Sequence, residues 1–106
     1  MPKFLMRASY TPEGIKGVLR EGGTSRRSTI EELARNLGGT VEAFYFAFGE
    51  DDAYVIAEFP DSASAVAVSA TINASGAVRL TTIPLLTAEE VDEATQKGVD
   101  YRPPGT

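Results

Sequence analysis

The sequence predicts an α+β domain with a four-stranded antiparallel sheet, and three features of the chain lead to this prediction. Four short segments are rich in apolar residues with the period of β-strands, and helical patterns separate the first from the second and the third from the fourth. The second and third segments follow each other directly through an acidic turn, as in a hairpin. A chain of 106 residues has room for one modest core, so we expect a single domain over residues 1–106.

The first part of the chain predicts a strand followed by a broken helical connection. Residues 3–10, KFLMRASY, have the period of a strand. Thr11-Pro12-Glu13 supplies an N-cap, a proline at the first helical position and an early acid, which together favour a helix start. Gly22-Gly23 interrupts this helix, and apolar residues at helical spacing resume until Gly38-Gly39, a C-cap signal. We expect a long helical connection that is broken at the first glycine pair.

The hairpin of residues 41–59, VEAFYFAFGEDDAYVIAEF, with its turn at residues 49–52, carries large apolar or aromatic residues on both faces of its strands. A sheet with one face in water would alternate apolar and polar residues instead. One layer of helices can cover one face in a chain this short, so we expect a second copy of the chain, as a homodimer or higher oligomer, to cover the other. The candidate interface residues are Phe44, Phe46 and Phe48, with Tyr101 and Arg102 in the stiff tail YRPPG. The alternative for this tail is a lid over a pocket.

The last part of the chain predicts a helix, a strand and a second, short helix. Asp61 caps an alanine-rich helix that ends near residues 73–76. Residues 77–86 form a fourth strand, in which Pro84 indicates an edge or a bulge. A capping box at residues 87–90 starts a short acidic helix. The complete order is the βαββαβ pattern of ferredoxin-like domains with a C-terminal helix, and both crossover helices should lie on one face of the sheet.

Charge and hydropathy exclude two classes of partner. The net charge is −5 and no basic face stands out, so we expect neither nucleic acid nor an anionic membrane as a partner. The sequence contains no run of about 18 apolar residues, as a membrane span would need. It also shows no positively charged segment followed by an apolar one, as in a secretory signal, so we expect a cytoplasmic protein.

The absence of cysteine and histidine restricts the chemistry that this chain can perform. It cannot supply a thiolate nucleophile, an iron–sulfur or zinc–thiolate site, a histidine base or the usual haem ligand. The adjacent acids Glu50, Asp51 and Asp52 lack the spaced loop that calcium sites use, so we expect no metal site and no cofactor. Chemistry based on carboxylate, tyrosine, lysine or arginine side chains is still open.

Several polar residues are candidates for binding a small ligand. Tyr10, Tyr45 and Tyr54 could line a pocket and donate hydrogen bonds to it, although buried tyrosines more often pack a core. Arg7, on a strand that should be central, and Arg79 could recognise a carboxylate or phosphate. The alternative for these arginines is an ion pair with acids of a second subunit.

Three further groups of residues are candidates for a functional site, and each also has a purely structural explanation. Asn73 could bind a substrate oxygen, but Asn at this place more often ends a helix. Glu42, Glu58 and Asp52 could act as bases if an apolar pocket desolvated them, and such acids are otherwise solvated at a strand edge or in a turn. The pair Arg26-Arg27 follows glycines as in a phosphate-binding turn, but two basic residues at a helix start are usually in solvent.

Four stretches, residues 9–23, 37–56, 73–94 and 101–105, resemble the GYD-domain family of small bacterial proteins. That family is named after a Gly-Tyr-Asp segment at the hairpin turn, where this chain has an aspartate, Asp51, in place of the tyrosine. The resemblance implies a dimeric α+β barrel. The wider superfamily includes cofactor-independent monooxygenases, haem-degrading enzymes, dehydratases and stress-induced proteins, so the resemblance supports a pocket more than one activity.

Three functions are compatible with these features. We expect first a homo-oligomeric protein that binds a small apolar or aromatic molecule between its helices and its aromatic strands. The second is a cofactor-independent oxygenase or isomerase on an aromatic or β-dicarbonyl substrate, for which the absence of Trp and His is unfavourable. The third is a structural assembly unit without a ligand.

Overall fold

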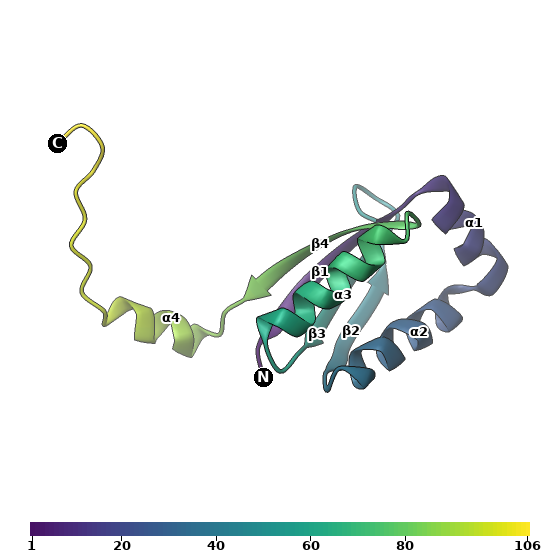
Figure 1. Cartoon of the computed structure of the whole chain (residues 1–106), viewed down its shortest axis with the longest axis horizontal. Helices are drawn as coiled ribbons and strands as arrows, with labels where there is room; N and C mark the ends of the chain where they lie inside the picture. The colour runs from purple at the N-terminus through teal and green to yellow at the C-terminus, as the bar shows by residue number, and fades with distance from the viewer.

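A computed structural model covering residues 1–106 shows an α+β fold in which helices cover one face of a four-stranded antiparallel sheet (Figure 1). The strands are hydrogen-bonded in the order β2-β3-β1-β4, which is the ferredoxin-like arrangement predicted from the sequence. Their bounds are Lys3–Tyr10 for β1, Thr40–Phe46 for β2, Ala53–Glu58 for β3 and Val78–Leu85 for β4.

Three of the four helices lie on the same side of the sheet (Figure 1). Helix α3, Ser62–Ala74, packs along β4, and α2, Gly23–Asn36, packs along β2. Helix α1, Pro12–Glu21, connects β1 to α2. Helix α4, Ala88–Thr95, lies apart from these three, beyond the end of β4.

The predicted start signals and the predicted break determine the helix bounds. Thr11 caps α1, because its side-chain Oγ1 accepts a hydrogen bond from the backbone N–H of Gly14 at 3.2 Å. Asp61 caps α3 through the N–H of Ser64 at 2.8 Å, and this bond lowers the pKa of Asp61. Between α1 and α2 the chain breaks at one residue, Gly22, whose φ of 87° is a conformation that favours glycine. The broken helical connection is therefore confirmed.

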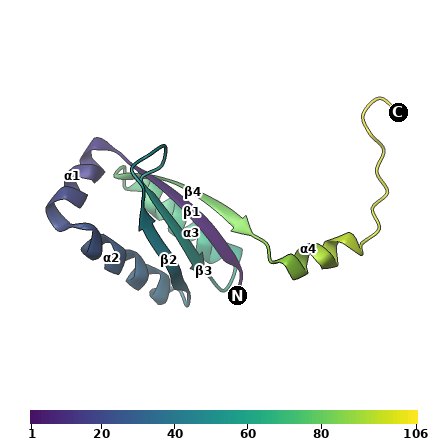
Figure 2. The same ribbon diagram turned by 180° about the vertical axis from the view of Figure 1, so that it is seen from behind.

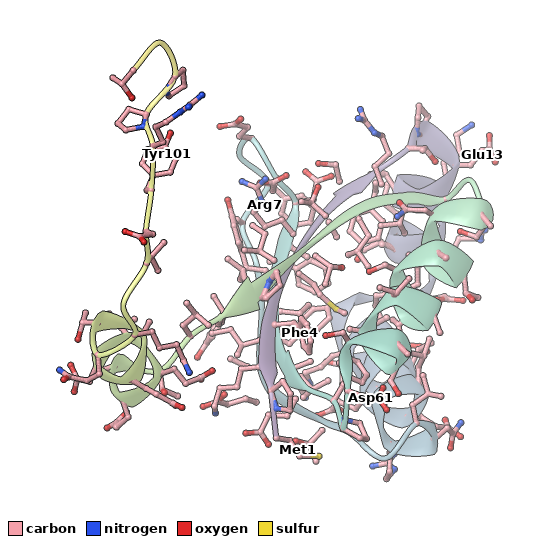
Figure 3. All side chains as sticks on the ribbon, turned by 60° about the vertical axis from the view of Figure 1, so that its left-hand side comes forward. Met1, Phe4, Arg7, Glu13, Asp61 and Tyr101 are labelled. Carbon is pink, nitrogen blue, oxygen red and sulfur yellow. The ribbon has the colours of Figure 1, made fainter.

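The hydrophobic core lies between the sheet and α2 and α3. Phe4 points from β1 toward the helices (Figure 3), and its ring centroid lies 6.1 Å from that of Phe59. Ala34 of α2 and Ala65 of α3 are buried against these rings, and such small residues let the helices approach the sheet closely. We call this side of the sheet the covered face.

The opposite side, which we call the open face, has no helix on it (Figure 2). The strand register places Ala43, Ile56, Leu5 and Ile83 side by side across the four strands, so an apolar row crosses the middle of the open face. The neighbouring row contains Tyr45, Tyr54, Arg7 and Thr81. The open face is thus partly apolar, as the two-sided hairpin predicts.

Both edges of the sheet depart from a regular ladder. A bulge in β2 between Val41 and Ala43 inserts an extra residue opposite β3. On the other edge, β4 contains Pro84, which has no N–H to offer. The predicted place of Pro84 at an edge is confirmed.

The hairpin turn is longer than the predicted span of residues 49–52, because β2 ends at Phe46. The chain then folds back on itself, and the N–H of Asp52 donates to the carbonyl of Ala8 on β1 at 2.8 Å. Phe48 therefore lies in the turn with a φ of 55° instead of continuing the strand.

Residues 86–106, which we call the arm, project away from the sheet and its helices (Figures 1 and 2). Every residue of the arm is exposed, and the hydrogen bonds of residues 87–106 join arm residues to one another. The radius of gyration is 16.9 Å, whereas a compact domain of this size would have about 13 Å. In Figure 3 the arm lies on the side of the open face.

Candidate ligand cleft between the helices

A cleft of about 430 Å³, which we call the helix cleft, opens between α1, α2 and α3. Its floor is formed by the end of β1 and the start of β4. The lining is about half apolar and half polar. Its residues are Tyr10, Glu13, Gly14, Gly17, Val18, Arg20, Glu21, Arg26, Thr29, Ile30, Leu33, Thr71, Ile72, Ser75, Ala77 and Val78.

Two glycines in α1 shape this cleft. Gly14 lets α1 approach the start of β4, because a Cβ at this position would lie 2.0 Å from the carbonyl oxygen of Ala77. Thr11 holds the same contact, since its N–H donates to the Ala77 carbonyl at 3.0 Å. Gly17, one turn further along α1, lines the cleft, and a Cβ there would meet nothing closer than Arg20 at 4.0 Å. The space beside Gly17 is therefore open.

Next to the helix cleft lies a small apolar cavity of about 30 Å³, between the helices and the covered face. The cleft and the cavity share six lining residues, namely Tyr10, Arg26, Ile30, Leu33, Ile72 and Val78. Sixteen of the seventeen residues around the cavity are hydrophobic, and Arg26 is the exception. A ligand in the cleft would thus have an apolar surface beside it.

Arg26 is the unusual residue of this site. Its side chain is half-buried, and its Nε is shielded from solvent without a hydrogen-bond acceptor in the chain. It makes none of the salt bridges of the molecule. Of the pair Arg26-Arg27, Arg27 is exposed as expected, whereas Arg26 is only partly in solvent. The sequence holds a signal for this difference, because Arg26, Ile30 and Leu33 share one face of α2 at the spacing i, i+4, i+7.

The structure separates the predicted ligand residues into two groups. Tyr10 lines both the helix cleft and the cavity. Arg7, Tyr45, Tyr54 and Arg79 are on the open face instead, with Arg7 pointing away from the helices in Figure 3. A ligand role for these residues stays a prediction, and Tyr10 alone among them faces the helix cleft.

A polar cluster occupies one end of the open face, where the hairpin turn folds onto β1. Asp51 accepts a hydrogen bond from the hydroxyl of Ser9 at 3.2 Å and from that of Tyr54 at 3.5 Å. Its Oδ2 lies 3.8 Å from Nε of Arg7, so the two side chains form an ion pair, although Nε has no hydrogen-bond acceptor. The neighbouring Asp52 accepts from the backbone N–H of Tyr10 at 2.8 Å. Both acids thus hold the turn against the sheet.

At the other end of the open face, three charges form a chain of ion pairs. Nζ of Lys3 lies 2.7 Å from Glu42 and 3.1 Å from Glu58. Hydrogen bonds to these two carboxylates raise the pKa of Lys3, and the bond from Lys3 lowers the pKa of Glu58. Within one subunit these acids therefore pair with Lys3, and Arg7 pairs with Asp51.

Asn73 joins α3 to β4 through its side-chain amide. Its Nδ2 donates to the carbonyl of Leu80 at 3.1 Å, and its Oδ1 accepts from the N–H of Leu80 at 2.7 Å. Since one residue of β4 engages both ends of the amide, Asn73 has a structural role at the end of α3. It does not line the helix cleft.

The candidate interface residues lie in three different places. Phe44 and Phe46 pack against the core on the covered face, and Phe44 also lines the small cavity. Phe48 lies in the hairpin turn with 59% of its surface exposed. Tyr101, 71% exposed, and Arg102 belong to the arm. The interface role of these five residues stays a prediction.

Comparison with known proteins gives one match. The family model described as the GYD domain matches residues 4–95, which include the whole helix cleft and all four strands except Lys3. No curated protein and no solved structure matches the chain. None of the helices has the length and apolar character needed to span a bilayer.

Proposed function

Because the chain belongs to the GYD-domain family, and because the matched region contains an open cleft and an uncovered sheet face, we propose that it is a homo-oligomeric protein that binds a small molecule in the helix cleft. Ligand pockets commonly have volumes of about 300–1,000 Å³ and combine apolar walls with a few polar groups. The helix cleft fits this description with a volume of about 430 Å³.

The observation that carries the binding proposal is that the helix cleft and the neighbouring apolar cavity share six lining residues. A ligand would contact Ile30, Leu33 and Ile72 on the apolar side, and these residues line both spaces. Thr29 and Thr71 offer hydroxyl groups from the rim. This combination suits a small molecule with an apolar body.

Native mass spectrometry of the protein purified gently from its own host tests this proposal. We expect the wild-type protein to carry a constant extra mass. Gly17→Phe places a ring in the open space of the cleft and should remove that mass. Leu19→Phe is the control, because Leu19 is 80% exposed on α1 and does not line the cleft. A bare wild-type protein, or a Gly17→Phe variant that retains the mass, would contradict binding in the helix cleft.

The oligomer proposal is supported by two surfaces of the same chain. The open face has an apolar row through Leu5, Ile56 and Ile83 that no helix covers. The arm lies on the same side of the sheet (Figure 3), and its exposed apolar residues include Val99 and Tyr101. Removing both surfaces from water at one interface would stabilise a pair of subunits. We therefore propose a second copy of this chain as the partner of the open face.

Light scattering at micromolar concentration tests the oligomer directly. The wild-type protein should have at least twice the 11.3 kDa mass of one chain. Leu5→Glu places an unpaired charge in the middle of the apolar row and should give monomers, because burying that charge in an interface is unfavourable. Leu19→Glu, which changes an exposed residue of α1, should leave the mass of the oligomer unchanged. A wild-type monomer would refute the oligomer proposal.

A further inference from the structure

We infer that the ligand of the helix cleft is a monoanionic carboxylate with an aryl or alkyl body, and that Arg26 binds its carboxylate group. This inference rests on the proposed binding role of the cleft and specifies the class of ligand. It follows from the surroundings of Arg26, from the apolar residues that continue its helix face and from the other charges around the cleft.

The guanidinium of Arg26 lacks a partner within the protein. Its Nε is buried and has no acceptor, although nearly all such groups in folded proteins have one. The carboxylates of the chain that form ion pairs do so with Lys3, Arg7 and Lys16. A guanidinium presents donors in a planar fork that matches a carboxylate in a bidentate pair. A carboxylate in the helix cleft would give the guanidinium, which forms no salt bridge within the chain, an acceptor group on its cleft side.

The position of Arg26 between two spaces determines how such a ligand would lie. Arg26 lines the helix cleft and is also the one charged residue around the apolar cavity. Ile30 and Leu33 follow it along the same face of α2 and line both spaces. The apolar cavity, about 30 Å³, has room for only the end of an apolar group. The body of the ligand therefore lies in the cleft, along Ile30 and Leu33, with its carboxylate at Arg26.

The remaining charges around the cleft favour one negative charge on the ligand over two. The charged residues that line the cleft are Glu13, Glu21, Arg20 and Arg26, so a dianion such as a phosphate monoester would leave a larger excess of negative charge there than a monoanion would. Glu13 pairs with Lys16 at 3.7 Å, and because both acids and Arg20 are exposed, their interactions are screened by solvent. A monoanion neutralises Arg26 without adding a second charge close to the two glutamates.

Isothermal titration calorimetry with 3-phenylpropionate and with its neutral isostere 3-phenylpropanamide tests this inference. The two probes have the same apolar body and differ in the charge of the head group. The wild-type protein should bind the propionate about tenfold more tightly, as expected for a charge-assisted pair in a partly buried site. Arg26→Met keeps an apolar stem of similar length and should bind both probes equally. Arg27→Met removes the neighbouring exposed cation of α2, which does not line the cleft, and should retain the preference.

The outcomes separate the carboxylate inference from the proposed binding function. Equal affinity of the two probes for the wild-type protein would overturn the role of Arg26, even if native mass spectrometry finds a ligand in the cleft. Failure of both probes to bind would also overturn the inference for this class of ligand.

Thermal unfolding of the variants distinguishes binding from a structural role of Arg26. Arg26→Met should unfold at the same temperature as the wild type or higher, because it removes a buried group that has no partner. A clear loss of stability would show that Arg26 serves the fold, and this would contradict the inference. Arg26→Lys retains the charge but loses the planar fork, so it should bind the propionate more weakly than the wild type while still preferring it.

Discussion

The two faces of the same four strands have different compositions. On the covered face, Phe4, Met6, Val55 and Ala57 are buried against the helices, and no charged side chain is among the buried residues. On the open face, the alternate residues of these strands combine an apolar row with charged and polar groups at both ends. The covered face is completed within one chain, whereas the open face has side chains suited to an interface and no partner within the chain.

This difference indicates that apolar residues on the two sides of a strand can serve two purposes, a core on one side and an interface on the other. A core needs dense packing without unpaired charges. An interface between subunits combines an apolar centre with polar residues that remain in water when the subunits separate. The open face has the second pattern, with Leu5 and Ile56 in its centre and the pairs of Lys3 and Arg7 toward its ends. Variants of each face can measure how differently the two faces contribute to stability, and Gly14→Ala adds the helix layer to this comparison.

The largest effect should come from Phe59→Ala on the covered face. Phe59 is 1% exposed and contacts Phe4, so its truncation should lower the free energy of unfolding by about 3–5 kcal/mol. Tyr54→Ala truncates an aromatic residue on the open face that is 36% exposed, and it should cost markedly less. Urea denaturation at one fixed protein concentration measures both values. Equal losses would mean that the two faces contribute alike to the fold.

A smaller loss is expected from Gly14→Ala in the helix layer. The new Cβ would meet the backbone carbonyl of Ala77 at 2.0 Å, so α1 must shift away from β4. Such overpacking costs about 1–3 kcal/mol. Gly17→Ala is the matched control in the same helix, and it should be neutral or stabilise by up to about 1 kcal/mol, because its Cβ meets no such obstacle. Thermal unfolding of the two variants side by side tests this contrast, which fails if both are destabilised alike.

On the open face, Asp51→Ala should cost roughly 1 kcal/mol. The substitution removes the counter-charge of Arg7 and the acceptor for Ser9 and Tyr54, but Arg7 is partly in solvent, which limits the loss. Glu50→Ala, which changes an exposed acid of the same turn, should have no measurable effect. Chemical denaturation of both variants gives the difference. A neutral Asp51→Ala would show that the polar cluster does not hold the turn.

The smallest effect is a dependence of stability on pH through Lys3 and Glu58. The pKa of Glu58 is lowered from 4.5 by its bond from Lys3, so its contribution is complete above pH 4.5 and is lost as the pH falls through the lowered value. The pKa of Lys3 is raised from 10.5, so its contribution is complete below pH 10.5 and is lost as the pH rises through the raised value. Thermal unfolding against pH, compared with Glu58→Gln, should show a slightly shallower acid loss in the variant.

Much of the fold could be predicted because short-range signals determine it. Thr11, Asp61 and the capping box at Thr87 begin the helices where the sequence indicates, and Gly22 breaks the connection because glycine accepts a positive φ. The hairpin turn was not predicted correctly. The turn includes a hydrogen bond from the backbone N–H of Asp52 to the carbonyl of Ala8. This bond joins residues far apart in the sequence, so the periodicity of the hairpin could not predict it.

The sequence also did not determine which hairpin residues lie on which face. The bulge in β2 puts both Val41 and Phe44 on the covered face, although an odd spacing of three would place them on opposite faces of a regular strand. The site was predicted only in outline, as a pocket between helices and sheet with Tyr10 among its candidates. The sequence offers Arg26 only as part of a weak phosphate-binding turn, because adjacent arginines at a helix start are usually solvated and the burial of its Nε depends on tertiary packing.

The bulge in β2 and Pro84 in β4 have a consequence for the behaviour of concentrated solutions. A protein with an unprotected outer strand can recruit further chains one after another, and this leads to filaments and insoluble deposits. Here the outer strand β2 has a bulge that interrupts its backbone hydrogen bonding, and the outer strand β4 lacks one N–H donor at Pro84. Growth by strand addition is disfavoured on both sides, so this chain should remain dispersed during storage at high concentration.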